Sequence, residues 1–198
     1  MTEIVDLSAA AGQLSDLIER VDQDRLGAPT PCDDSTIGDV LDHISGVAQA
    51  FRAAAAKELG ALTSAVPAPD GSRLRADWRV EIPKQLAALV QAWADPSAWE
   101  GMTQVGGVDL PGAVAGQIAH NEIVLHGWDL AQGSGLPYQP DSDSLQACLS
   151  ALSVMYPPEH LERRQGIFGP PVDVPQDAPL VDRVVAFSGR DPSWTAHT

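Results

Sequence analysis

A glutamate and a histidine, two residue types that bind divalent metals, are four positions apart in the stretch AHNEIVLHGWDL, residues 119–130. In a helix such residues share one face, so Glu122 and His126 would lie one turn apart, with Asp129 on the same side. The same half of this helix carries apolar residues, namely Ala115, Ile118, Ala119, Leu125 and Leu130, whereas His120, Val124 and Trp128 face away from it. The ligand-type side chains are therefore predicted to lie within the core-facing stripe.

This placement favours a metal site. An ionised carboxylate in an apolar stripe loses its hydration, and a bound metal would offset that cost. The alternative is an exposed pair of Glu122 and His126 that stabilises the helix by roughly a few tenths of a kcal/mol and has no further role. A metal site also needs at least a third ligand from elsewhere in the chain.

His43 is a candidate for that third ligand, at the margin of a second apolar stripe. A lone histidine in such a place is more often a core or boundary residue than a ligand, and both alternatives stay open. Asp39, one turn earlier, would either hold the other ring nitrogen of His43 or act as a first-turn acid that interacts favourably with the helix dipole. Thr36 and Asp39 have the spacing of a capping box, which predicts a helix start.

The composition narrows the protein class. The 198 residues carry a net charge of -15, with 27 acidic and 12 basic residues, which argues against nucleic acid and anionic membranes as partners. The chain has no apolar run long enough to cross a membrane, and Glu3 and Asp6 stand where a signal peptide would be basic and then apolar. We expect a soluble cytoplasmic protein, either a monomer or a homodimer.

Two cysteines, Cys32 and Cys148, are expected to stay reduced, and neither belongs to a cysteine cluster of the zinc-finger type. Cys32 near a helix start could be a nucleophile with a lowered pKa, although a small buried side chain is the alternative. The pair Arg163 and Arg164 is interpreted as a solvated turn. Trp128 is interpreted as packing between its helix and the C-terminal tail.

Apolar periodicity predicts an all-α chain. Helices are expected over residues 7–22, 35–59, 79–94, 112–132 and 142–155, with a short helix over 181–187 that Gly189 ends. One short strand is expected within 103–110 and an extended tail over 167–179. The connector 60–77 contains Pro, Gly and Ser and has no predicted structure, but it is long enough to run back along a helix. The second and third helices could then run parallel.

The segment PTPCDDSTIGDVLDH, residues 29–43, resembles a helix opening in the actinobacterial branch of the DinB-like superfamily of metal-binding bundles. This branch is related to the metal-binding domain of mycothiol-dependent maleylpyruvate isomerase. The segment EIVLHGWDLA, residues 122–131, is similar to its metal-binding helix, and FGPP at 168–171 with RVVAFSGRDP at 183–192 resembles its tail. This chain has Ser35 where an aromatic residue is usual.

The resemblance implies a DinB-like four-helix bundle joined up-down-down-up by a long crossover, followed by C-terminal helices and an extended tail. We expect a single domain over residues 1–198, with the bundle core at about 5–135 and a C-terminal extension over 136–198. The resemblance also implies a divalent metal, zinc as first choice and nickel as second, held by His43, Glu122 and His126.

Two histidines and a carboxylate leave a coordination position open, as in catalytic zinc sites. The expected function is a metal-dependent thiol S-transferase, in which a cosubstrate such as mycothiol becomes a thiolate and attacks an electrophile. Asp39 and Asp129 would orient the ligands, and His120 would be dispensable. Isomerase activity itself is not expected, because the isomerase has a further C-terminal domain that contributes to its site and this chain is too short to hold it. The alternatives are a non-catalytic metal- or ligand-binding bundle and, on weaker grounds, a metal-dependent hydrolase with Asp129 as base.

Overall fold

The computed structural model describes residues 4–32, 34–66 and 68–196, so Asp33 of the first motif and Pro67 of the connector lie outside the described residues. Helices dominate the described part, which confirms the all-α prediction. The helices are α1 Ser8–Arg20, α2 Ile37–Ala55, α3 Ala61–Ser64, α4 Trp78–Trp93, α5 Gly112–Ser134, α6 Ser142–Met155, α7 Leu161–Arg164 and α8 Leu180–Phe187. Between them lie the strands β1 Met102–Val105 and β2 Val108–Pro111 and the 3-10 turns η1 Gln23–Arg25, η2 Gly71–Arg73 and η3 Pro96–Trp99.

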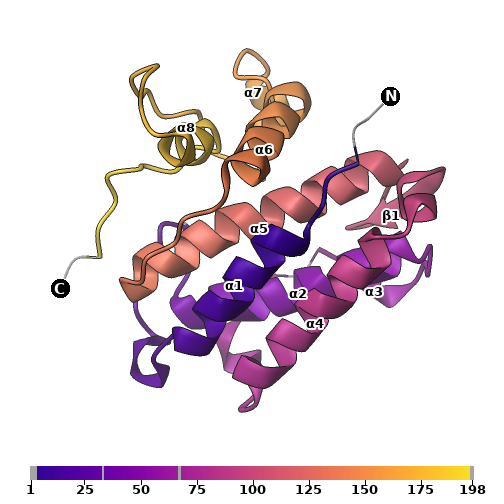
Figure 1. Ribbon diagram of the computed structural model, residues 1–198, viewed down its shortest axis with the longest axis horizontal. Coiled ribbons are helices and arrows are strands. Elements are labelled where there is room, and N and C mark those ends of the chain that lie inside the picture. Colours follow the sequence, from indigo (N-terminus) through magenta and orange to yellow (C-terminus); the bar gives the residue numbers. More distant parts are fainter. Residues whose placement is uncertain (1–3, 33, 67, 197–198) are drawn as a thin grey trace.

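Helices α1, α2, α4 and α5 form a bundle in the expected up-down-down-up order (Figure 1). Arg25, just after α1, donates to the carbonyl of Gly133 near the end of α5, so α1 and α5 end on the same side. Lys57, just after α2, donates to Ala98 just after α4, so α2 and α4 end together at the opposite side. The helices α2 and α4 are therefore parallel, as the length of the connector allows.

The start of α2 is fixed by local hydrogen bonds that its sequence predicts. The Thr36 hydroxyl accepts from Asp39 N at 3.3 Å, and Asp39 Oδ2 accepts from Thr36 N at 2.8 Å. This confirms the predicted capping box, in which two end N–H groups of the helix find partners.

The connector is more ordered than expected, since it contains α3 and η2. Asp70 accepts from Ser72 N at 3.0 Å and so closes η2, and Asp39 Oδ1 accepts from Gly71 N at 2.6 Å. These bonds hold the returning chain against the start of α2. The prediction of a structureless connector was wrong because short Asp-capped turns have no apolar periodicity to reveal them.

The single strand expected within 103–110 is a hairpin of β1 and β2. Val105 pairs with Val108, and the two turn residues, Gly106 and Gly107, have φ angles of +57° and +78°. Such a turn favours glycine because side chains strain this backbone conformation.

The C-terminal extension packs outside the bundle, with α6 against α5 and α8 against α6 (Figure 1). As a result α5 is covered on both sides, and His120, Val124 and Trp128 are buried although they face away from the glutamate. Arg164 is also buried and donates to the carbonyls of Tyr156, Gly169 and Phe187. The prediction of a solvated turn was therefore wrong for Arg164.

Among the described helices, none combines the length and the apolar character that a membrane-crossing segment requires.

Candidate metal centre

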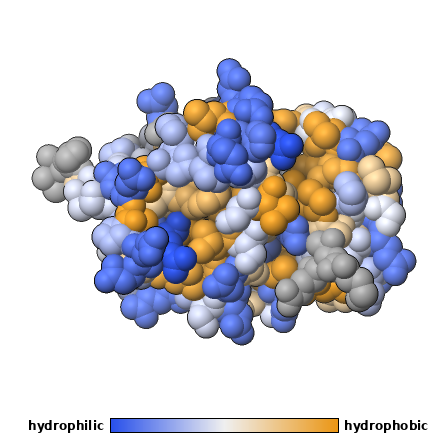
Figure 2. Space-filling model, turned by 90° about the horizontal axis from the view of Figure 1, so that it is seen from above, coloured by the Kyte–Doolittle hydropathy of each residue, from blue (hydrophilic) through white to orange (hydrophobic). Residues whose placement is uncertain are grey.

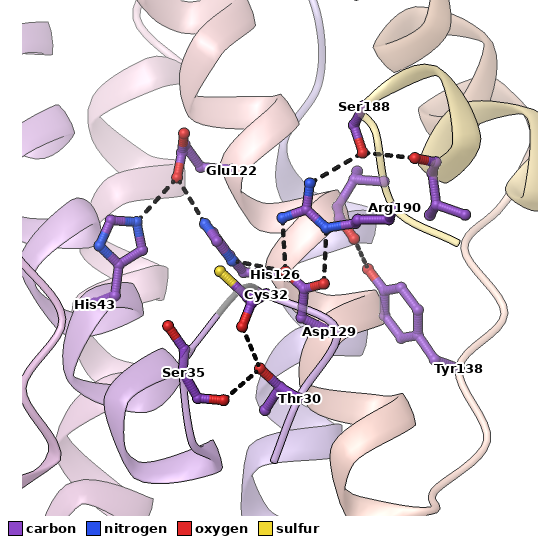
Figure 3. A network of polar contacts seen from close by, with 12 residues as sticks. Thr30, Cys32, Ser35, His43, Glu122, His126, Asp129, Tyr138, Ser188 and Arg190 are labelled. Carbon is purple, nitrogen blue, oxygen red and sulfur yellow. Dashed lines mark hydrogen bonds and ion pairs between the residues drawn. The ribbon is translucent and has the colours of Figure 1, made fainter. Parts of the chain in front are cut away.

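The side chains of His43, Glu122 and His126 meet between α2 and α5 (Figure 3). One oxygen, Glu122 Oε2, lies 3.2 Å from His43 Nε2 and 3.1 Å from His126 Nε2. The two imidazole rings are 4.7 Å apart at their centroids. Candidate ligand atoms of all three residues lie within 4.8 Å of one another, although His43 is 79 residues from Glu122 in the chain.

The spacing of these atoms fits a small divalent ion. Zinc bonds of about 2.0–2.1 Å in a tetrahedral arrangement place neighbouring ligand atoms about 3.3 Å apart. The two measured nitrogen-to-oxygen distances, 3.2 and 3.1 Å, are close to that edge length. Two neutral imidazoles and one carboxylate are also a donor set that suits zinc and nickel. The residues present therefore fit the ion that the sequence motif implies.

The three side chains are only partly shielded from solvent. Exposed fractions are 16% for His43, 25% for Glu122 and 12% for His126. Part of each side chain is therefore in contact with solvent. A purely structural zinc site is usually closed by four protein ligands, whereas this triad supplies three.

Electrostatics at the triad favour an ionised carboxylate. Burial acts to raise the pKa of Glu122, but hydrogen bonds to His126 and His43 outweigh it and hold this pKa well below its ordinary value. For His126 burial acts to lower the pKa, yet the hydrogen bonds and charges of Asp129 and Glu122 raise it to about 9. A metal that binds at His126 must therefore displace a proton that two carboxylates stabilise.

Asp129 links the triad to the C-terminal extension. Its Oδ2 atom lies 3.0 Å from His126 Nδ1, and both carboxylate oxygens accept hydrogen bonds from Arg190 (Figure 3). The Asp129 side chain is fully buried; burial acts to raise its pKa, but the charge and hydrogen bonds of Arg190 outweigh it and lower the pKa. A carboxylate on Nδ1 favours the tautomer in which the lone pair of Nε2 points to the other ligands.

The other residues singled out from the sequence lie at different distances from this centre. Asp39 gives its two oxygens to Thr36 and Gly71 in the helix cap, so its expected action on the His43 ring stays a prediction. Cys32 is half-buried beside the triad, with a candidate ligand sulfur within 4.8 Å of the corresponding atoms of His126 and Asp129. It is therefore less buried than the small packed side chain that the sequence offered as the alternative to a nucleophile.

Gly127 explains how the motif helix accommodates its neighbours. A Cβ atom at this position would lie 2.6 Å from Cζ of Tyr138, whose ring packs directly on the backbone there. The hydroxyl of Tyr138 donates to the carbonyl of Val124 at 3.4 Å. The absence of a side chain at Gly127 therefore lets the segment after α5 fold back along the helix next to His126.

Among the described residues, a pair of cavities lies away from the triad. The larger, about 770 Å³, lies between the N-terminal segment, α5 and α6, and Asp6, Gln117 and Asp141 are among its lining residues. Figure 2 looks down on this side of the molecule, where apolar side chains gather between polar ones. The smaller, about 380 Å³, lies between α6 and the residues from Pro171 to Gln176. Neither is lined by His43, Glu122 or His126.

Arg190 is the site residue that sequence reasoning missed. It is 61 residues from Asp129 in the chain, so no local spacing joins them. The signal available was the resemblance of residues 183–192 to the tail of related bundles, which marks the segment but not the partner of its arginine.

Comparisons with known proteins agree with this fold. Residues 7–131 match the family model of the mycothiol maleylpyruvate isomerase N-terminal domain. Two uncharacterized proteins from strains of Mycobacterium tuberculosis are each 26% identical over 176 residues, which cover 88% of this chain and 90% of theirs. The crystal structures of the mycothiol-dependent maleylpyruvate isomerase and of a histidine-to-alanine mutant are similar with a TM-score of 0.56, at 18% and 17% identity. Each comparison covers 75% of this chain and 68% of the isomerase chain, and at this identity it shows the fold alone.

Proposed function

This chain belongs to the family of the mycothiol maleylpyruvate isomerase N-terminal domain, and from this premise we propose that it binds a divalent metal and transfers a small-molecule thiol to an electrophile. The family match confirms the resemblance that residues 29–43 and 122–131 indicate. The observation that carries the proposal is the convergence of His43 Nε2 and His126 Nε2 on Glu122 Oε2 at 3.2 and 3.1 Å.

We propose zinc as the metal, with nickel as the second choice, because two imidazoles and one carboxylate suit both ions. When bound, the metal would lower the pKa of a thiol at its open coordination position, which makes the thiolate the nucleophile at neutral pH. The family match supports a thiol of the mycothiol type as the cosubstrate. In the transfer itself the sulfur forms a bond to carbon, and the leaving group departs with the bonding electrons.

The residues of the chain have distinct roles in this scheme. His43, Glu122 and His126 hold the metal, and Asp129 keeps Nδ1 of His126 hydrogen-bonded so that Nε2 faces inward. Glu122 is the most exposed of the three, at 25%, and we infer that thiol and electrophile would approach from its side. In this scheme, holding the thiol next to the electrophile would raise the rate by proximity.

A non-catalytic metal-binding bundle with a structural or regulatory role is the second candidate. It is favoured by the position of the two cavities, neither of which reaches the triad. The two candidate functions differ in thiol turnover, because only a transferase would consume thiol in the presence of an electrophile. Isomerisation is not part of the proposal.

Metal analysis of tag-free protein tests the ligand set. Zinc or nickel close to one per chain is expected in the wild type and is expected to be lost in His43→Ala, Glu122→Ala and His126→Ala. The matched control is His160→Ala, because His160 is 47% exposed and pairs with Glu162 instead of the triad. A wild-type protein that stays empty after both metals are offered would overturn the proposal.

Activity is then measured with metal-loaded protein, mycothiol and an electrophile that releases chloride, such as a chloromethyl fluorophore. Thioether formation that requires the metal and fails in the ligand variants supports the transferase. Stoichiometric metal without acceleration across a panel of such electrophiles favours the binding protein.

A further inference from the structure

We propose that Arg190 is a positioning residue of the metal centre, which fixes the His126 ring through Asp129. Arg190 lies in the C-terminal extension, beyond the residues that match the family model, 7–131. The inference rests on the metal site proposed above and adds that the extension is needed for its full affinity.

The contact between Arg190 and Asp129 is a two-pronged ion pair. Arg190 Nε donates to Asp129 Oδ1 and Nη2 donates to Asp129 Oδ2, each at 2.7 Å (Figure 3). The third nitrogen, Nη1, donates to the hydroxyl of Ser188 at 2.9 Å. The Arg190 side chain is 10% exposed and the Asp129 side chain is not exposed at all. The planar fork of arginine matches a carboxylate in this way, whereas lysine would offer a single point of charge.

Because Asp129 is buried, its carboxylate depends on this ion pair. A carboxylate without exposure is costly unless a partner neutralises it, and removal of one partner from a buried pair leaves an uncompensated charge. Without Arg190, the Asp129 carboxylate would lose the two hydrogen bonds that fix its orientation and would turn toward solvent. His126 Nδ1, now 3.0 Å from Asp129 Oδ2, would then lose the acceptor that sets its tautomer and ring orientation.

The fold delivers Arg190 to this point through the end of α8. Gly189 has a φ angle of +89°, and Arg190 N donates to Val185 O at 3.0 Å, which turns the chain back at the helix end. Gly189 also packs on the backbone of Gly169, where a Cβ atom would come within 2.9 Å. Buried Arg164 joins the same segments, because it donates to Gly169 O and Phe187 O. The position of Arg190 is thus held from two sides.

Zinc affinity, measured by competition with a chromophoric chelator, tests the inference on full-length protein. We expect Arg190→Met and Asp129→Asn each to weaken zinc binding about 10- to 100-fold. The double variant should lose little more than either single variant, since both remove one support of His126. Arg25→Met is the matched control: it makes the same substitution at an arginine that donates to Gly133 O of the same helix but not to Asp129, and it should bind zinc as the wild type does.

The outcomes separate this inference from the metal site itself. If the wild type does not bind zinc, the proposed function fails. If the wild type binds zinc and Arg190→Met binds it equally well, or if the losses simply add in the double variant, Arg190 does not act through Asp129. If Arg190→Met does not fold, Asp129→Asn decides, because a wild-type zinc affinity in this near-isosteric variant overturns the inference. Partial recovery in Arg190→Lys over Arg190→Met would support it.

Discussion

Helix α5 carries two histidines six residues apart, His120 and His126, whose pKa values are shifted in opposite directions. On the side of α2, the charges and hydrogen bonds of Asp129 and Glu122 overcome the effect of burial and raise the pKa of His126 to about 9. On the side of the N-terminal segment and α6, burial lowers the pKa of His120 to about 4, and the charges of Asp141 and Asp6 offset this only in part. Among the described residues, His120 Nε2 has no hydrogen-bond partner.

The difference shows that burial alone does not decide what a histidine does. Both side chains are largely shielded from water, but only His126 has carboxylates within hydrogen-bond distance, 3.1 Å to Glu122 and 3.0 Å to Asp129. The arrangement around His126 stabilises positive charge, whether proton or metal. The surroundings of His120 destabilise positive charge, because burial lowers the pKa of this histidine. One face of α5 is therefore suited to a cation, and the other is ordinary core with an unsatisfied nitrogen.

Replacing the carboxylate that both ligand histidines share should have the largest effect. In Glu122→Gln the amide keeps the shape but not the charge, so zinc affinity should fall by about 100-fold or more. The pKa of His126 should fall as well, because one of its two carboxylate partners is gone. Chelator competition and NMR titration of the ring measure the two effects. An unchanged zinc affinity would remove Glu122 from the ligand set.

His120 should make the protein less stable in mild acid. Because its pKa of about 4 in the folded state lies below the ordinary 6.5, the unfolded chain binds the proton more readily between these values. The free energy of unfolding should therefore fall as the pH is lowered from 6.5 to 4, by up to roughly 3 kcal/mol from this residue. His120→Leu should remove this part of the pH dependence, as measured by urea unfolding at pH 7 and 5.

The control for that measurement is His160→Leu, at an exposed position, which should leave the pH dependence as it is. If His120→Leu and the wild type lose the same stability on acidification, the contrast between the two histidines of α5 is not as the structure indicates. Zinc binding at pH 7 should be unaffected in His120→Leu, in line with the expectation that this residue is dispensable for the metal.

Gly127→Ala should destabilise the side of α5 that faces Tyr138. The added methyl would stand 2.6 Å from Cζ of Tyr138, so the ring must move. We expect a loss of about 1–3 kcal/mol in the free energy of unfolding, typical of an overpacked site. Combining it with Tyr138→Leu should recover part of the loss, and full additivity of the two changes would show that the ring is not the obstacle.

Local chemistry explains which parts of this structure the sequence could predict. The periodicity of α2, α5 and α6 and the Thr36–Asp39 capping box depend on residues three or four apart, and these predictions are confirmed. Glu122 and His126 share a face for the same reason. His43 belongs to another helix, where its position beside an apolar stripe left two interpretations open, and the family resemblance then pointed to it as the third member of the triad.

Contacts between segments far apart in the chain could not be predicted from the sequence. Arg164 looks like a solvated residue in the sequence, but once the chain folds it donates to three carbonyls, those of Tyr156 just after α6, Gly169 in the tail and Phe187 at the end of α8. His120 does face away from the triad as its helical angle predicts, yet α6 and the N-terminal segment cover that side. In each case the partner lies in an element whose position no local pattern specifies, so burial could not be read from one helix alone.

The two cysteines repeat the contrast between the two sides of α5, with a smaller effect. Cys148 in α6 is fully buried, and burial raises the pKa of its thiol. Cys32 is half-buried beside His126 and Asp129 on the other side.

Because the thiolate is the reactive form, a chromogenic disulfide should modify close to one cysteine in the folded protein and two in urea. Mass spectrometry of the folded sample should find the label on Cys32. Because bound zinc would order the neighbouring His126, labelling should slow when zinc is present. Label on Cys148 instead would contradict the packing of α6 against α5.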